Sequence, residues 1–317
     1  MLEKKFDVLV AGELNIDLIL NGLQQFPEVG KEILADKMIY TMGSSSAIFA
    51  SNLSTLGVSV NYCGCIGNDD FGKKIIADLD AKGVGNNDII RSNTVATGIT
   101  VAFSFEQDRA MITYPGAMNE LSESDIKDDL LKNTKHLHVS SVFIQPALKP
   151  DLTKLFKRAK QFGLTTSLDP QWDSYEQWDC DWKNLLPNVD VFLPNIEELK
   201  NITKQQNIKD AVASLKDFAN IIVVKNSVEG ATAFYKDEMI EQPAFINHDF
   251  IDAIGAGDSF DAGFICAYIR DKSLQECAAL GAICGALNTT ANGGTTAFVD
   301  LRSIKELALK KFNYTIQ

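Results

Sequence analysis

The sequence predicts an α/β protein with a mostly parallel central sheet and helices on both faces. Between residues 136 and 224, short apolar runs alternate with amphipathic stretches, and this alternation is typical of strands joined by crossover helices. β-rich segments near the start of the chain have no place in that alternation, so we expect them to form a small separate sheet. No low-complexity linker or internal repeat interrupts the chain. We therefore predict a single domain, 1–317, with lid strands at about 13–41 and 97–115 inserted in it.

The expected strands of the main sheet are short runs rich in Val, Ile and Leu, bounded by turn residues. They are residues 6–11, 58–66, 136–142, 165–168, 189–193 and 221–224, followed by a late hairpin at 232–235 and 239–242. The surplus strands are 15–20, 32–40 and a hairpin at 97–114 that turns at Gln107 and Asp108. Such a sheet at one edge of the main sheet would act as a lid.

The expected helices have apolar residues at helical spacing, and the first two are followed by Gly57 and Gly83, which favour helix ends. They are residues 45–56, 71–82, 150–161, 196–203, 208–218, 258–270 and 274–288.

The composition argues against several classes of partner. The 317 residues include 42 acidic and 30 basic side chains, for a formal net charge of −12, and an acidic surface repels nucleic acid and anionic membranes. The six cysteines are scattered through apolar stretches and do not form a zinc pattern. The charged N-terminus lacks an apolar signal region, and no apolar run approaches the ~20 residues of a membrane span. We expect a cytoplasmic protein with free thiols.

The segment 251–263, I-D-A-I-G-A-G-D-S-F-D-A-G, carries the most chemical information. Gly255, Ala256 and Gly257 are small residues just before a predicted helix, where backbone N–H groups lack internal partners and the helix dipole favours an anion. Asp258, placed at the first helical position, can accept a proton from an attacking hydroxyl beside that cradle. The alternative is that Asp258 is only an N-cap and the glycines only a loop.

The stretch D-A-I-G-A-G-D-S-F resembles the C-terminal signature of the ribokinase-like (PfkB) carbohydrate kinase family, D-T-x-G-A-G-D-x-F. Other blocks resemble family motifs in the same order along nearly the whole chain. They are G-E-L-N-I-D at 12–17, C-I-G-N-D-D-F-G at 65–72, D-R-A-M-I-T-Y-P-G-A at 108–117 and P-N-I-E-E at 194–198. The resemblance implies a three-layer α/β/α sandwich with a β-sheet lid, and an ATP-dependent kinase that uses Mg²⁺. Lid strands in this family often pair between subunits, so a homodimer is compatible with the sequence.

The resemblance also assigns roles to matching positions. Asp258 matches the catalytic base, and Gly255, Ala256 and Gly257 match the anion hole. Positions expected to bind the nucleotide are Asn195, Lys225, Ser227, Gly230, Gly257 and Asn288. Glu198 is expected to organise Mg²⁺ through water, while Asp252 and the backbone of Ile254 match a loop that holds a monovalent cation such as K⁺. For Lys225, a solvated lysine at a strand end is the alternative.

On the substrate side, Asn15 and Asp17 match residues that hydrogen-bond sugar hydroxyls, with a plain Asx turn as the alternative. The family's G-G-x-x-x-N reads here from Gly43 to Ile48, with Ser44 in place of the second glycine and Ile48 in place of the asparagine. We expect Gly43, Ser44 and Ile48 to line the substrate site and the change to alter substrate choice.

Five positions also bear on the choice of substrate and nucleotide. Ser45 stands where members acting on sugar phosphates carry lysine, which favours an unphosphorylated substrate. Arg109, in the lid hairpin, is a candidate contact for an acidic substrate or else a solvated turn residue. Gln171 and Asp173 stand where many members carry asparagine and arginine, and Ser227 replaces a glycine near the phosphates.

The sequence therefore predicts an enzyme that phosphorylates a hydroxyl of a small, unphosphorylated sugar or sugar acid. A nucleoside kinase of the same family and a catalytically silent sugar-binding regulator are the alternatives. An NAD-dependent dehydrogenase is disfavoured, because the first strand is not followed by G-x-G-x-x-G.

Overall fold

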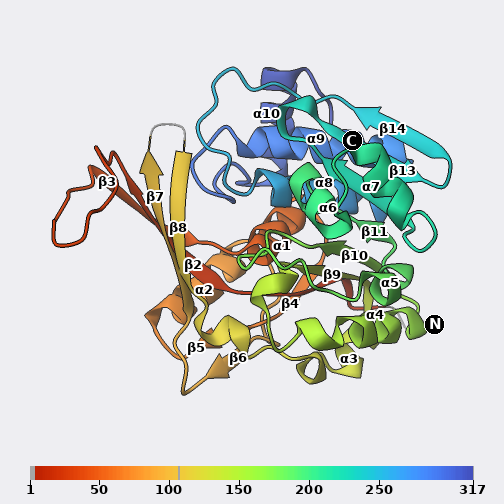
Figure 1. Ribbon diagram of the computed structural model, residues 1–317, viewed down its shortest axis with the longest axis horizontal. Helices are drawn as coiled ribbons and strands as arrows, with labels where there is room; N and C mark the ends of the chain where they lie inside the picture. The colour runs from red at the N-terminus through yellow and green to blue at the C-terminus, as the bar shows by residue number, and fades with distance from the viewer. Residues whose placement is uncertain (1–3, 106–107, 317) are drawn as a thin grey trace.

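Eight strands form the main sheet of the protein (Figure 1), whose computed structural model describes residues 4–105 and 108–316. In spatial order they are β14 (Glu238–Gln242), β13 (Ala231–Tyr235), β12 (Ile221–Lys225), β11 (Val191–Phe192), β10 (Thr165–Asp169), β9 (Thr134–Ser140), β1 (Phe6–Ala11) and β4 (Val60–Cys63). All neighbours from β12 to β4 are parallel, and only β13 runs against the others, so that its pairs with β12 and β14 are antiparallel. The predicted mostly parallel sheet is confirmed.

Helices cover both faces of this sheet. The α-helices are α1 (Ser45–Thr55), α2 (Asp70–Ala81), α3 (Asp128–Lys132), α4 (Leu152–Gln161), α5 (Trp182–Leu185), α6 (Ile196–Thr203), α7 (Ile208–Leu215), α8 (Ala256–Tyr268), α9 (Leu274–Asn288) and α10 (Leu301–Phe312). Alternate residues of β1 enter two separate cores: Val8 and Val10 pack with α1, α2, α8, α9 and α10, whereas Leu9 and Ala11 pack with α3 to α7. Each core holds one layer of helices on the sheet, as expected for strands whose side chains alternate between faces.

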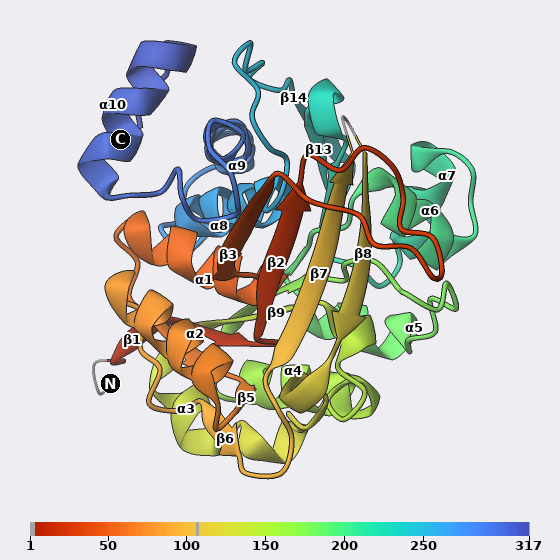
Figure 2. The same cartoon turned by 90° about the vertical axis from the view of Figure 1, so that its left-hand side faces the viewer.

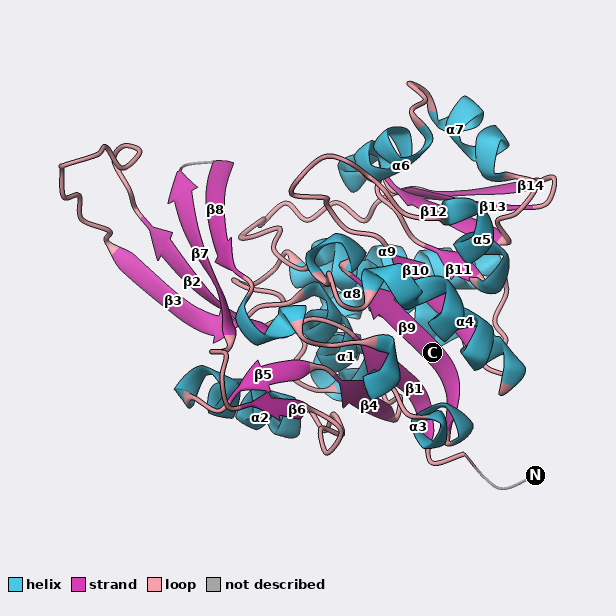
Figure 3. Cartoon of the chain, turned by 60° about the horizontal axis from the view of Figure 1, so that its bottom comes forward, coloured by secondary structure: helices cyan, strands magenta, loops and turns pink. Residues whose placement is uncertain are grey.

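A second, four-stranded sheet stands apart from the main strands, and we call it the lid sheet (Figures 2 and 3). Its order is β3 (Lys37–Met42), β2 (Asn15–Asn21), β7 (Gly98–Phe105) and β8 (Asp108–Tyr114). The predicted hairpin is present as β7 and β8, but Gln107 of its predicted turn lies outside the described residues. The strand expected at 32–40 begins only at Lys37, because its partner β2 ends at Asn21, which is paired with Lys37.

The sequence prediction missed the short helices α3 and α5 and two larger features. The single strand expected at 58–66 is two strands, β4 and β5 (Cys65–Gly67), and β5 leaves the main sheet to pair with β6 (Ile90–Ser92). Gly64 lies at the break, where a Cβ would stand 2.8 Å from the carbonyl oxygen of Gly12. The C-terminal helix α10 was not predicted at all. Its Ile304 and Ala308 are buried in the core.

Candidate active site

The candidate active site lies where the carboxyl ends of β10 and β12 meet the N-terminus of α8. Asp169 is the last residue of β10 and Lys225 the last of β12, and ligands of parallel α/β sheets bind at this edge. Helix α8 begins at Ala256 rather than at 258, with Gly255 as N-cap in the left-handed region, φ 76°. Asp258 is therefore the third residue of the helix rather than the first. It is not an N-cap, and the N–H groups of Gly257 and Asp258 belong to the turn that lacks intrahelical acceptors.

Asp258 is buried and is held through one of its two oxygens. Oδ1 accepts hydrogen bonds from the hydroxyl of Ser45 on α1 and from Nε2 of Gln171, the latter at 3.0 Å. Burial raises the pKa of Asp258 to about 6, and the hydrogen bond from Ser45 acts in the opposite direction. A carboxylate with this pKa is ionised at neutral pH yet basic enough to accept a proton, as a general base requires.

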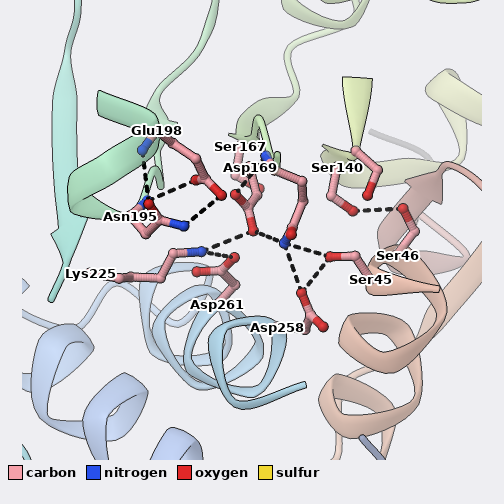
Figure 4. A network of polar contacts seen from close by, with 12 residues as sticks. Ser45, Ser46, Ser140, Ser167, Asp169, Asn195, Glu198, Lys225, Asp258 and Asp261 are labelled. Carbon is pink, nitrogen blue, oxygen red and sulfur yellow. Dashed lines mark hydrogen bonds and ion pairs between the residues drawn. The ribbon is translucent and has the colours of Figure 1, made fainter. Parts of the chain in front are cut away.

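Next to Asp258 lies a group of three ionisable side chains, Asp169, Lys225 and Asp261, which we call the ion cluster (Figure 4). Lys225 Nζ is 2.9 Å from Oδ2 of Asp169 and 2.9 Å from Oδ2 of Asp261. Burial raises the pKa of Asp261 well above its usual value. Burial also acts to raise the pKa of Asp169, but the charge of Lys225 and the hydrogen bond from Asp261 together lower it. We infer that Asp261 holds a proton and that Lys225 neutralises Asp169. Lys225 is thus paired with two carboxyl groups and only 12% exposed at its side chain, so it is not a solvated lysine.

Asn195 and Glu198 form a capping box at the start of α6. The Glu198 carboxylate accepts from the Asn195 backbone N–H at 2.8 Å and from its Nδ2 at 2.6 Å, while Asn195 Oδ1 accepts from the Glu198 N–H at 2.9 Å. Burial, with Asp169 nearby, raises the pKa of Glu198 to about 8. The described residues hold no group of three or more His, Cys, Asp or Glu arranged for a metal. The oxygens here fit Mg²⁺, which usually keeps several waters and shares phosphate oxygens.

A cavity of about 250 Å³ opens between α8, α9 and the loop before α8. Its wall is apolar and rich in small residues, which suits a flat ring system. It is lined by Lys225, Ser227, Val228, Gly230, Ala244, Phe245, Ile246, Asn247, Phe250, Ala253, Ala256, Gly257, Phe260, Ala282, Gly285, Ala286 and Thr289. Of the predicted nucleotide-binding residues, four therefore line it: Lys225, Ser227, Gly230 and Gly257. Asn195 and Asn288 lie outside its lining.

Asn288 belongs instead to the loops around residues 252–254 and 293. Its Nδ2 donates to the carbonyl of Ile254 at 2.6 Å. Oδ1 of Asp252 accepts from the Ile254 N–H, and Oδ2 accepts from the Gly293 N–H, both at 2.9 Å. The predicted cation-binding positions are therefore brought together, and the carboxylate of Asp252 joins the two loops.

The inner face of the lid sheet, which faces the main domain, carries a polar row. Asp17 is paired with Thr41 on one side and Thr100 on the other, and Thr100 with Thr113, so these four residues cross all four strands on one face. Asn15 lies on the same face, and its Nδ2 donates to Asp17 Oδ1 at 2.8 Å and to Thr100 Oγ1 at 3.0 Å. A Cβ on Gly43 would clash with Asp17. Asn15 and Asp17 are thus strand residues and not a plain turn.

The serines that replace the family's glycine-rich segment bind two different carboxylates. Ser46 donates to Glu13 through both its N–H, at 3.1 Å, and its hydroxyl, at 2.5 Å, and Ser44 Oγ donates to the Glu13 carbonyl at 2.6 Å. Ser45, between them, turns to Asp258. Ser44 adopts φ 73°, so it keeps the backbone conformation that favours glycine at this position. The serines therefore tie the start of α1 to both carboxyl groups.

Two other predicted substrate residues lie apart from this row. Ile48 is 3% exposed and packs against Gly294 and Gly255, so it supports the loop in which the anion hole is predicted. Arg109 is the second residue of β8, four positions before Thr113 of the polar row, and it is paired with Ser104.

Sequence reasoning assigned no role to four residues of the site: Asp169, Asp261, Glu13 and, as a contact of the base, Gln171. A signal existed for the first two, because Asp169 ends an apolar strand and Asp261 lies one helical turn after Asp258. Glu13 is buried with its carboxylate bonded to Ser46 and Ser141, and burial raises its pKa to about 7.

All six cysteines are free, as predicted.

A family model described as pfkB family carbohydrate kinase matches residues 5–300. An ATP-dependent ribose-1-phosphate kinase from Halopiger xanaduensis is 27% identical over 92% of this chain and 94% of its own length. A nucleoside kinase from Methanothermobacter thermautotrophicus is 24% identical, covering 86% of this chain and 85% of its own. The structure of Arabidopsis thaliana ribokinase with ribose and ATP has the same fold, with a TM-score of 0.85 and 24% identity over 98% of this chain and 99% of that one.

The family match over nearly the whole chain, together with these relatives, defines a kinase of sugars or nucleosides. The chain belongs to the pfkB family of carbohydrate kinases. The predicted family and fold are confirmed. In residues 4–105 and 108–316, no helix combines the length and apolar character that crossing a bilayer would require.

Proposed function

We propose that the protein transfers the γ-phosphoryl group of ATP to a hydroxyl of a small, unphosphorylated sugar or sugar acid, with Asp258 as general base. The observation that carries this proposal is the position of Asp258, buried in the first turn of α8 beside Gly255, Ala256 and Gly257 and next to a cavity suited to a nucleotide. A kinase needs a base, an anion cradle and a nucleotide pocket that meet at one point, and groups suited to these three roles adjoin one another here, which supports the proposal.

In the proposed reaction, the acceptor hydroxyl gives its proton to Asp258 as its oxygen attacks the γ-phosphorus. The bond from that phosphorus to the oxygen of ADP breaks, and ADP leaves. The N–H groups of the first turn of α8, with the positive end of its dipole, stabilise the charge on the transferring group. Lys225 lies at the wall of the nucleotide cavity and is held there by Asp169 and Asp261, so that it adds positive charge near the phosphates.

The nucleotide base would occupy the apolar cavity, between Phe250 and the small residues of α9. Glu198 and Asn195 would hold Mg²⁺ through water, and the ion would supply charge neutralisation of the phosphates. Asp252 and the carbonyl of Ile254 would bind a monovalent cation such as K⁺ beside the anion hole. Each of these roles is one that the family resemblance implies for the matching position of this chain.

The acceptor would lie under the lid sheet, against Asn15, Asp17 and Gly43. Carboxylate and amide groups on an inner face suit a ligand with several hydroxyls. Ser45, a short neutral side chain bonded to Asp258, supplies no charge for a second phosphate, and this supports an unphosphorylated acceptor. Because Asn15 and Asp17 would bind the hydroxyls of a ribose equally well, a nucleoside is the second candidate acceptor.

The test is ADP release from MgATP across a panel of sugars, sugar acids and nucleosides, with wild type and Asp258→Asn side by side. We expect turnover with one class of acceptor, and a loss of about 10³-fold or more in Asp258→Asn, at the scale of a general base's contribution. Asp237→Asn is the matched control, since this carboxylate is exposed and pairs with Lys216 away from the site. If some acceptor raises the melting temperature but none turns over, the protein is a sugar-binding regulator and the proposal fails.

A further inference from the structure

Gln171 links Asp258 to the ion cluster. Among the side-chain hydrogen bonds of the described residues, only those of Gln171 reach both. It follows β10 through Pro170, with φ 57° in the left-handed region. Its Nε2 lies 2.7 Å from Asp169 Oδ2, 2.7 Å from Ser45 Oγ and 3.0 Å from Asp258 Oδ1. An uncommon backbone conformation is thus kept at the residue whose amide points into the site.

Ser45 completes this arrangement. Its hydroxyl accepts from Gln171 and donates to Asp258, so the proton of Ser45 is directed toward the carboxylate. Both donors use the same oxygen of Asp258, Oδ1. In the described part of the chain, the recorded hydrogen bonds to this carboxylate all end at Oδ1. Oδ2 is therefore the oxygen available to a bound hydroxyl.

We propose that Gln171 and Ser45 are positioning residues, which hold Asp258 by Oδ1 so that Oδ2 faces the acceptor hydroxyl. This inference rests on the proposed function, since it assumes that Asp258 is the base. In the reaction the O–H bond of the acceptor breaks, its proton passes to Oδ2, and the oxygen forms the new bond to phosphorus as ADP leaves. The two donors remain on Oδ1 throughout and do not exchange a proton with the substrate.

The loop that carries Gln171 is held by contacts that do not involve its amide. The carboxylate of Asp173 accepts from the backbone N–H groups of Tyr175 at 2.9 Å, Gln177 at 2.9 Å and Trp178 at 2.7 Å. Trp178 in turn packs edge-on against Phe143, with ring centroids 5.5 Å apart. Removing the amide of Gln171 should therefore leave the loop in place, and this makes a purely structural role testable.

The two hydrogen bonds to Asp258 also influence the pH at which its carboxyl group loses its proton. Asp169 on β10 and Glu198 on α6 are acidic neighbours, Lys225 on β12 is the basic one, and Asp261 lies one turn further along α8. Hydrogen bonds from Ser45 and Gln171 favour the charged carboxylate and so lower the pKa of Asp258. Because the base acts only when deprotonated, the rate falls as pH drops below this pKa. Losing either donor should move that fall to higher pH.

The experiment measures kcat and kcat/KM against pH, with the acceptor found in the panel, for Gln171→Gly, Gln171→Leu, Gln171→Asn and Ser45→Ala. Glycine tolerates the left-handed backbone, so Gln171→Gly keeps the test valid if Gln171→Leu folds poorly. Gln177→Leu is the matched control, because this glutamine lies on the same loop and its amide donates to the Tyr175 carbonyl instead.

We expect kcat to fall about 10- to 100-fold in Gln171→Gly and Ser45→Ala, the effect of one hydrogen bond to a charged group. The acceptor KM should change less than about threefold, and the acid limb should move up by about one pH unit. Gln171→Asn should recover part of kcat, and Gln177→Leu should match wild type. A wild-type rate and acid limb in Gln171→Gly, or an effect on KM alone, overturns the positioning role. Turnover retained in Asp258→Asn overturns the proposed function instead, so the two failures are distinguishable.

Discussion

The two sides of the candidate site differ in how their polar groups are satisfied. On the main-domain side, Asp169 and Asp261 are each 1% exposed, and Lys225 pairs with both. On the lid side, the polar row ends at Thr113, which is exposed and bonds to Thr100 at 3.0 Å. The buried charges therefore depend on one another for stability, whereas the exposed hydroxyl at the end of the polar row can exchange water for a ligand with little effect on folding.

This difference predicts that substitutions on the main-domain side lower both stability and turnover, while those on the lid affect substrate affinity alone. The reason for this expectation is burial. Water cannot hydrate a buried charge that has lost its partner, but it can form hydrogen bonds with an exposed hydroxyl.

Lys225→Met should show the largest effect. It leaves the Asp169 carboxylate buried without its cation, which costs about 3–5 kcal/mol of unfolding free energy, and it removes positive charge from the nucleotide cavity. Urea denaturation and the ADP-release assay measure the two losses. Lys216→Met is the matched control, since Lys216 pairs with Asp237 on the exposed surface at 2.6 Å and should change little.

Lys225→Met combined with Asp169→Asn separates charge from packing. Because the double variant no longer buries an unpaired carboxylate, it should recover much of the lost stability but not the activity. If Lys225→Met alone unfolds at the same urea concentration as wild type, the ion cluster is not what stabilises this side of the site.

How far the sequence could predict this contrast depends on the distance along the chain between interacting residues. Gly255, Ala256, Gly257 and Asp258 lie within one helical turn, so the local sequence pattern is enough to predict that they lie together. Ser45 and Asp258 are 213 residues apart, and Ser45 and Gln171 are 126 apart. No spacing rule connects such positions, and only the packing of α1 and the residue after β10 against α8 brings them together.

Glu13 lies at the boundary between the two sides of the site, where the chain passes from β1 to β2 of the lid sheet. Its effect on stability can be tested through pH. Its pKa is about 7 in the fold against 4.5 for a free side chain, so folding favours the protonated form. Its contribution to stability is greatest below pH 4.5 and is lost as pH rises through 7, a change of about 3 kcal/mol. Glu13→Gln should not show this pH-dependent loss. The unfolding free energy of the variant, measured relative to wild type, should therefore rise from pH 5 to pH 8.

Urea unfolding at pH 5, 6, 7 and 8 checks this expectation. Glu306→Gln, at an exposed carboxylate paired with Arg302, is the control and should show no such trend. A difference between Glu13→Gln and wild type that stays constant with pH would mean that Glu13 is ionised in the fold at all these pH values, stabilised by the serines around it.

Thr100→Val should have the smallest effect and be confined to substrate binding. The change keeps the shape of the side chain and removes the hydroxyl that contacts Asn15 and Thr113. With one hydrogen bond lost, acceptor KM should rise about 2- to 10-fold while kcat and the melting temperature stay near wild type. Tyr114→Phe removes a hydroxyl from the next residue of β8, which faces the opposite side of the lid sheet, and should leave KM unchanged. Equal effects in the two variants would show that the lid acts on the acceptor through its overall position, and not through the row of hydroxyls on its inner face.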